Sequence, residues 1–129
     1  MVNESFSNPA IAFLLVFMGG GLGASIRHYL YSFLNLFSSI SFQFSTLVIN
    51  LIGCFVAGLI FTQLTEMPKI KLFAITGLLG GFTTYSLFSI DALTLYEQSD
   101  IKSMIIYIGV SAIGSCIAAY LGFQLSKIF

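Results

Sequence analysis

The segment at residues 77–89 concentrates the groups of this chain that could bind an ion. It reads Gly-Leu-Leu-Gly-Gly-Phe-Thr-Thr-Tyr-Ser-Leu-Phe-Ser, so three glycines are followed by hydroxyl residues inside an apolar run. Adjacent glycines followed by two β-branched threonines form a weak point in a helix. A helix that breaks there exposes carbonyls, which attract cations, and N–H groups, which attract anions. The segment therefore predicts a broken helix with binding positions for ions.

Two other stretches place small, hydrogen-bonding residues on one helix face. One includes Thr46 and Asn50, and the other includes Tyr107, Ser111 and Ser115, each repeating with the period of a helix. Neutral amide and hydroxyl donors hold an anion weakly enough to release it, as conduction requires. The same groups could instead form hydrogen bonds between helices, worth roughly 0.6 kcal/mol each. The sequence leaves both interpretations open.

The ionisable residues and cysteines indicate no catalytic site. Arg27 and Asp91 lie near the ends of long apolar runs, where an ionisable residue is a functional candidate or reaches out to the membrane interface. His28 has no partner in the local sequence and is expected to be solvated. Cys54 and Cys116 fall within apolar runs, where a cysteine usually acts as a small hydrophobe. The sequence contains no HExxH or CxxC motif and no Ser/His/Asp set, which argues against an enzyme.

The elements that carry these residues are predicted to lie in a membrane. The 129 residues include five basic and five acidic side chains, and 8% are charged, against roughly a quarter in a soluble domain. Charge is absent from residues 5–26, 28–65, 72–90 and 103–126. A helix crosses about 30 Å of hydrocarbon with roughly 20 residues. We therefore expect an integral membrane protein, and the balanced charge argues against binding to nucleic acid.

Residues 1–129 are expected to form a single all-α transmembrane domain. Four helices are predicted, at about 8–35, 42–64, 69–96 and 101–127. The uncharged run at 28–65 is too long for one span, so its polar stretch at 38–43 is predicted to turn, and Pro68 ends the second helix. The first helix is expected to be retained, because Glu4 and no basic residue precede it. The third helix contains the glycine–threonine break.

Lys and Arg residues are divided almost evenly between the two sides of this predicted bundle. Lys69, Lys71 and Lys127 fall on one side, and Arg27 and Lys102 on the other. An excess of Lys and Arg on the cytoplasmic side normally sets the orientation of a membrane protein. A difference of one residue is a weak signal, which is consistent with insertion in both directions.

Three motifs resemble the signatures of the Fluc/CrcB fluoride channels. They are Gly-Gly-Gly-Leu-Gly-Ala-Ser-Ile-Arg at 19–27, Thr-Leu-Val-Ile-Asn-Leu-Ile-Gly at 46–53, and the run from Gly77 to Asp91. The resemblance covers the whole chain. It implies a fluoride-selective channel that passively exports toxic fluoride across the cell (inner) membrane. It also implies an antiparallel, dual-topology homodimer with two pores.

The resemblance also assigns roles to individual residues. The fluoride pathway that it implies contains Asn50, Thr46, Tyr107, Ser111 and Ser115, together with the aromatic pair Tyr85 and Phe88. Ring edges are the positive parts of aromatic side chains and can face an anion. Arg27 and Asp91 would lie at a vestibule, and the backbone carbonyls of Gly80 and Thr83 would hold a central sodium ion shared between subunits.

Two of these positions depart from the family pattern. Tyr85 stands where the family has Phe, and its hydroxyl could donate to fluoride or obstruct a narrow path; we expect it to donate. Asp91 stands where the family usually has Glu, so an acidic role is implied there.

Two alternatives remain open at the level of the sequence. A small-multidrug-resistance-like proton-coupled exporter also has four helices, but it needs a carboxylate in its first helix, where this chain has Arg27 and no Asp or Glu after Glu4. A non-transporting assembly subunit would use the polar faces only to join helices. It predicts that Asn50→Ala weakens assembly, whereas a channel predicts an assembled dimer without flux.

Overall fold

The computed structural model describes residues 8–37 and 42–128. These residues contain four apolar helical segments long enough to cross a membrane: Pro9–Leu36, Gln43–Phe61, Pro68–Glu97 and Ile101–Ser126. No β-strand occurs within the described ranges. The all-helical, four-span prediction is therefore confirmed.

The helices begin and end close to where local sequence signals place them. They are α1 (Pro9–Phe37), α2 (Phe42–Phe61), α3 (Pro68–Lys71), the π-helix η2 (Leu72–Leu79), α4 (Gly80–Phe82), α5 (Tyr85–Glu97) and α6 (Ile101–Ser126). Pro68 occupies the first position of α3, where its missing N–H is not needed. The Asp100 carboxylate caps α6 by accepting the Ser103 N–H at 3.0 Å.

Both ends of α2 bear on predicted boundaries. The helix α2 ends at Phe61, three residues earlier than expected, because the chain then tightens into a turn in which the Thr65 N–H donates to the Thr62 carbonyl at 3.3 Å. Of the turn predicted at 38–43, residues 38–41 lie outside the described residues, and Phe42 already belongs to α2.

The third span is broken where the glycine–threonine segment predicted it. Thr83 (φ −76°, ψ 156°) and Thr84 (φ −146°, ψ 118°) are extended and separate α4 from α5. Thr84 caps α5 through its hydroxyl, which accepts the Leu87 N–H at 3.2 Å. The π-helix that precedes the break was not predicted, since its apolar residues carry no signal for the wider turn.

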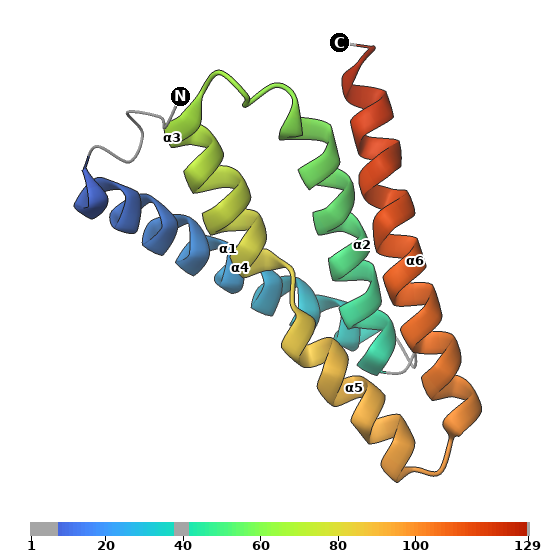
Figure 1. Ribbon diagram of the computed structural model, residues 1–129. Coiled ribbons are helices and arrows are strands. Elements are labelled where there is room, and N and C mark those ends of the chain that lie inside the picture. The colour runs from blue at the N-terminus through green and yellow to red at the C-terminus, as the bar shows by residue number, and fades with distance from the viewer. Residues whose placement is uncertain (1–7, 38–41, 129) are drawn as a thin grey trace.

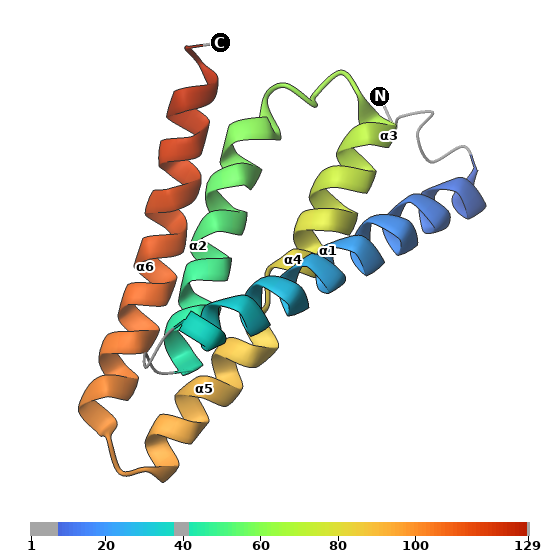
Figure 2. The ribbon, with the colours of Figure 1, turned by 180° about the vertical axis from the view of Figure 1, so that it is seen from behind.

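The helices form an open arrangement around this break. In both ribbon views α2 and α6 run side by side, α5 and α6 form a hairpin, and α1 crosses the third span obliquely (Figures 1 and 2). Close crossings depend on glycine, because a Cβ at Gly23 would overlap the Leu78 carbonyl and one at Gly122 would overlap the Phe55 carbonyl. Gly23 and Gly122 therefore allow the backbones to approach closely at these two crossings.

The interior of the protomer is small and partly polar. The most deeply buried side chains are Ile49, Ser45, Thr46 and Asp91. Large apolar side chains lie mostly on the outside, as expected where helices contact lipid or another chain. Polar groups are therefore enclosed at the centre of the bundle, where the break lies.

Candidate ion pathway

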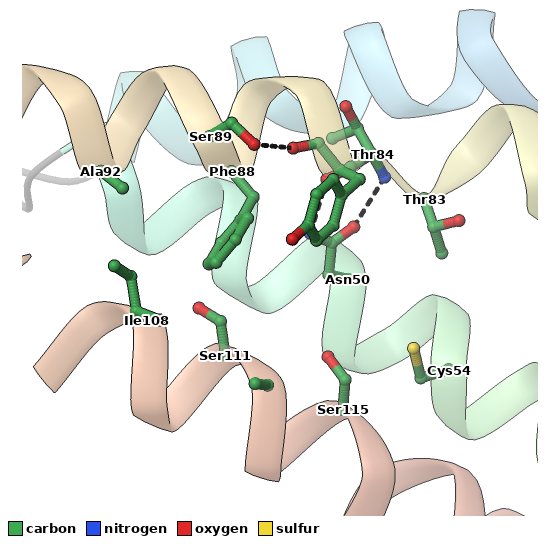
Figure 3. Close-up of a pocket in the computed structure, with 12 residues that line it drawn as sticks. Asn50, Cys54, Thr83, Thr84, Phe88, Ser89, Ala92, Ile108, Ser111 and Ser115 are labelled. Carbon is green, nitrogen blue, oxygen red and sulfur yellow. Dashed lines mark hydrogen bonds between the residues drawn. The ribbon is translucent and has the colours of Figure 1, made fainter. Parts of the chain in front are cut away.

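A cavity of about 600 Å³ opens between α2, the break, α5 and α6 (Figure 3). Its lining comprises Asn50 and Cys54 of α2, Thr83 and Thr84 of the break, Tyr85, Phe88, Ser89 and Ala92 of α5, and Ile108, Ser111, Ala112 and Ser115 of α6. The structure thus gathers five of the seven predicted pathway residues on one cavity, and all of the lining residues are uncharged.

The Asn50 side chain forms hydrogen bonds with the backbone at the break in the third span. Its Oδ1 accepts the Thr84 N–H at 2.8 Å, and its Nδ2 donates to the Thr84 carbonyl at 3.0 Å. Both backbone groups of an extended residue are thereby paired, although no helix can satisfy them. An amide Nδ2 carries two N–H groups, so one remains after the bond to the Thr84 carbonyl, and Asn50 lines the cavity. Asn50 therefore has a structural role and a free donor at the same time.

The break also frees two backbone carbonyls. In a continuous helix the Thr84 N–H would donate to the Gly80 carbonyl, and the Leu87 N–H to the Thr83 carbonyl. Here the first N–H donates to Asn50 and the second to the Thr84 hydroxyl. Gly80 is exposed and Thr83 half-buried in the single chain. Both carbonyl oxygens thus keep their lone pairs for another partner.

Two buried hydroxyls, those of Thr46 and Ser111, lie near the Tyr107 hydroxyl and form no well-aligned hydrogen bond within the described part of the chain. Ser111 is 6% exposed and lines the cavity, and Thr46, one turn before Asn50, is 1% exposed. Neither hydroxyl has a hydrogen-bond partner among the described residues. A buried hydroxyl left unsatisfied costs about 1–3 kcal/mol. These positions therefore favour a ligand or water that supplies the missing bond.

Three aromatic rings form a row that begins at the cavity, and its first two members line the cavity. The ring centroids of Tyr85 and Phe88 are 5.2 Å apart, and those of Phe88 and Tyr107 are 5.4 Å apart. Tyr85 is 80% exposed in the single chain, so it lies at the outer end of the row. Phe88 is fixed between two rings and presents an uncharged aromatic surface to the cavity (Figure 3).

Tyr107 has a different position from the one that the sequence suggested. Its hydroxyl donates to Asp91 Oδ2 at 2.9 Å, and the pair is buried rather than part of the cavity lining. The hydroxyl proton is therefore engaged by the carboxyl group, and the ring supports Phe88. Asp91, expected at a vestibule, is 0% exposed and receives this bond inside the protomer.

Arg27 is not brought to the cavity. It lies half-buried on α1, and its Nε is buried without a hydrogen-bond partner in the described ranges. Sequence reasoning missed Ser89 and Ala92, which lie one turn beyond Tyr85 and Phe88 and share their face of α5. The four-residue spacing could have identified both as lining residues.

The chain is similar to known proteins along nearly its whole length. Residues 14–123 match the family described as CrcB-like protein, Camphor Resistance (CrcB). A protein named Fluoride-specific ion channel FluC 2 from Nitrobacter hamburgensis is 41% identical over 114 residues, which cover 85% of this chain and 89% of the relative.

Two further relatives carry the name Fluoride-specific ion channel FluC. The protein from Azobacteroides pseudotrichonymphae is 35% identical and covers 89% of this chain and 95% of its own length. The protein from Dichelobacter nodosus is 36% identical, with coverages of 90% and 97%. The earlier resemblance is confirmed, and this multi-pass membrane protein belongs to the CrcB family, a family of ion channels rather than enzymes.

Proposed function

We propose that this protein is a fluoride-selective channel that passively exports fluoride across the cell (inner) membrane and relieves its toxicity. Relatives at 35–41% identity are named for fluoride. The cavity supports the same function, because its lining combines neutral donors with an aromatic surface and contains no charged side chain. Such groups replace part of the hydration of an anion without trapping it.

The unpaired hydroxyl of Ser111 is the observation that carries this proposal. It is buried, lines the cavity and lacks a hydrogen-bond partner among the described residues. Asn50, with its free N–H, and Phe88 line the same cavity. A donor without a hydrogen-bond partner among the described residues is available to an anion. Burial without a partner would otherwise cost stability.

The proposed assembly is an antiparallel homodimer with two pores. Exposed apolar side chains along the helices, and the 80% exposure of Tyr85, are consistent with a second copy or lipid on the outside. The near-even division of Lys and Arg supports insertion in both directions. Each copy contains its own cavity, so two copies would supply two pathways.

A sodium ion is part of the same proposal. The carbonyls of Gly80 and Thr83 have lost their helical donors, and backbone carbonyls are hard oxygen ligands suited to such a cation. Together with the same pair from a second copy they would hold the ion at the dimer interface. When bound, the ion would supply a fixed positive charge at the break and join the two copies.

Fluoride efflux from liposomes, measured with a fluoride electrode and compared with chloride efflux, tests the function. The full chain is expected to release fluoride far faster than chloride. Ser111→Ala should reduce fluoride efflux at least tenfold and leave the assembled size unchanged. Ser32→Ala is the matched control, because Ser32 is exposed on α1 and its hydroxyl only donates to the His28 carbonyl at 2.9 Å.

The choice of Ser111 separates a channel from an assembly subunit. Asn50→Ala cannot separate these two roles, because it also removes the two hydrogen bonds that Asn50 forms with the Thr84 backbone. Wild-type liposomes that release fluoride no faster than protein-free liposomes would refute the channel. Unchanged efflux in Ser111→Ala would show that Ser111 is not part of the pathway.

A further inference from the structure

Cys54 lies inside the proposed pathway rather than among packed helices. It is on α2, one turn beyond Asn50, and its thiol is free and half-buried. In the close-up its sulfur points into the space between α2 and α6, on the side where Ser115 also points (Figure 3). The sequence had suggested only a small hydrophobe at this position.

A second observation favours a polar occupant in this cavity. Ser111 is more than nine-tenths buried, and its hydroxyl has no partner in the described ranges and lines the same cavity. Water or an ion that satisfies Ser111 therefore shares a space with the Cys54 sulfur. A thiol reacts through its thiolate, which forms readily only where water or polar groups reach the sulfur.

The second cysteine provides an internal comparison. Cys116 lies on α6, is exposed on the single chain and does not line the cavity. A modification there adds bulk outside the cavity. One chain therefore carries two free thiols in the two environments that an accessibility experiment needs.

We propose that Cys54 is a thiol-modification site within the pathway, and that a small neutral electrophile attached there blocks ion passage. The proposal rests on the proposed channel function. With a maleimide, the thiolate sulfur adds to one carbon of the double bond, and the neighbouring carbon takes up a proton equivalent to the one that the thiol lost. A carbon–sulfur bond forms, no group leaves, and no oxidant is required.

The size of the cavity suits such an adduct. N-ethylmaleimide has about nine non-hydrogen atoms, and at ~30 Å³ each, the volume of a water molecule in the liquid, the adduct occupies at most roughly 270 Å³. The cavity measures about 600 Å³ and accepts it. Attached one turn from Asn50, the adduct would occupy a large part of the cavity next to that donor.

The experiment uses the full chain in liposomes treated with N-ethylmaleimide. Intact mass and peptide mapping identify the modified cysteine, and fluoride efflux of each sample is compared with that of its own untreated preparation. Cys116→Ser should be modified at Cys54 and lose at least 90% of its efflux. Cys54→Ser should keep its untreated efflux rate after the same treatment, whether or not Cys116 reacts.

Each outcome decides the proposal. An unmodified Cys54, a modified Cys54 with unchanged efflux, or equal inhibition of Cys54→Ser would overturn it. A failure of the channel function is recognised separately, because the untreated wild type would then release no fluoride. The adduct mass would still show whether Cys54 is a modification site, although the claim of blockage would fall.

Discussion

Replacing Asn50 with Ala should destabilise the protein as well as abolish conduction. The side chain forms two hydrogen bonds to the backbone of Thr84, at 2.8 and 3.0 Å, and Thr84 is only 8% exposed. Its removal leaves a buried N–H and a buried carbonyl without partners, each costing about 1–3 kcal/mol. Water from the adjacent cavity can reach these groups, so we use the lower part of that range, about 2–3 kcal/mol in total.

Thermal unfolding in detergent measures this cost. For a chain of this length 1 kcal/mol corresponds to about 3–5 °C, so the midpoint should fall by roughly 6–15 °C. The fraction of protein that elutes at its native size after heating gives the midpoint. Efflux from liposomes is measured on the same preparations.

Ser111→Ala is the control that separates loss of conduction from loss of stability. Ser111 has no hydrogen-bond partner among the described residues, so its loss removes no internal bond. It should lower efflux and leave the midpoint within about 2 °C of the wild type. An Asn50→Ala midpoint equally close to the wild type would refute the structural role of Asn50. A large shift in Ser111→Ala would refute the claim that its hydroxyl is free.

Three further changes test other parts of the site. Tyr107→Phe removes the hydrogen bond that the structure records to the Asp91 carboxylate within the described residues, and it should lower stability by about 1.5–3 kcal/mol in thermal unfolding. Tyr85→Phe should slow fluoride efflux by about ten- to a hundredfold, the value of one hydrogen bond to a charged group, if the hydroxyl donates to the ion. Much faster efflux would identify the hydroxyl as an obstacle. Hydrogen bonds from the Ser103 hydroxyl and N–H lower the pKa of Asp100. The stabilisation from this cap is therefore fully present above the ordinary aspartate pKa, and it is lost as pH falls through the lowered pKa of the folded state. The unfolding midpoints of wild type and Asp100→Asn should therefore converge as the pH is lowered through this range.

The sequence predicted the spans and the break because both depend on local chemistry. Clustered charges bound apolar runs of membrane length, and adjacent glycines followed by Thr83 and Thr84 disfavour a helix whatever surrounds them. The π-helix at Leu72–Leu79 has no comparable local signal. The early end of α2 at Phe61 likewise depends on a turn whose hydrogen bonds the sequence does not reveal.

The pairings within the site depend instead on how distant segments cross. Asn50 and Thr84 are 34 residues apart, and Asp91 and Tyr107 are 16 apart on different helices. Helical spacing places Asn50 and Tyr107 on polar faces, but it does not say which neighbour each side chain meets. The resemblance to fluoride channels implies one role, in the ion pathway, for both residues. The structure shows that Asn50 lines the cavity and that Tyr107 does not.

Both interpretations that the polar faces first allowed find support in these pairings. Asn50 and Tyr107 form hydrogen bonds that join separate segments, as an assembly role requires. Thr46 and Ser111, on the same two helix faces, keep buried hydroxyls without partners in the described part of the chain, as an ion pathway requires. Each face thus combines one residue that fixes the helices with one that stays available. Because the fixed residue holds its neighbourhood in place, the free hydroxyl next to it needs no internal bond to keep its position. We therefore expect loss of flux alone at Ser111, joint loss of flux and stability at Asn50, and loss of stability at Tyr107.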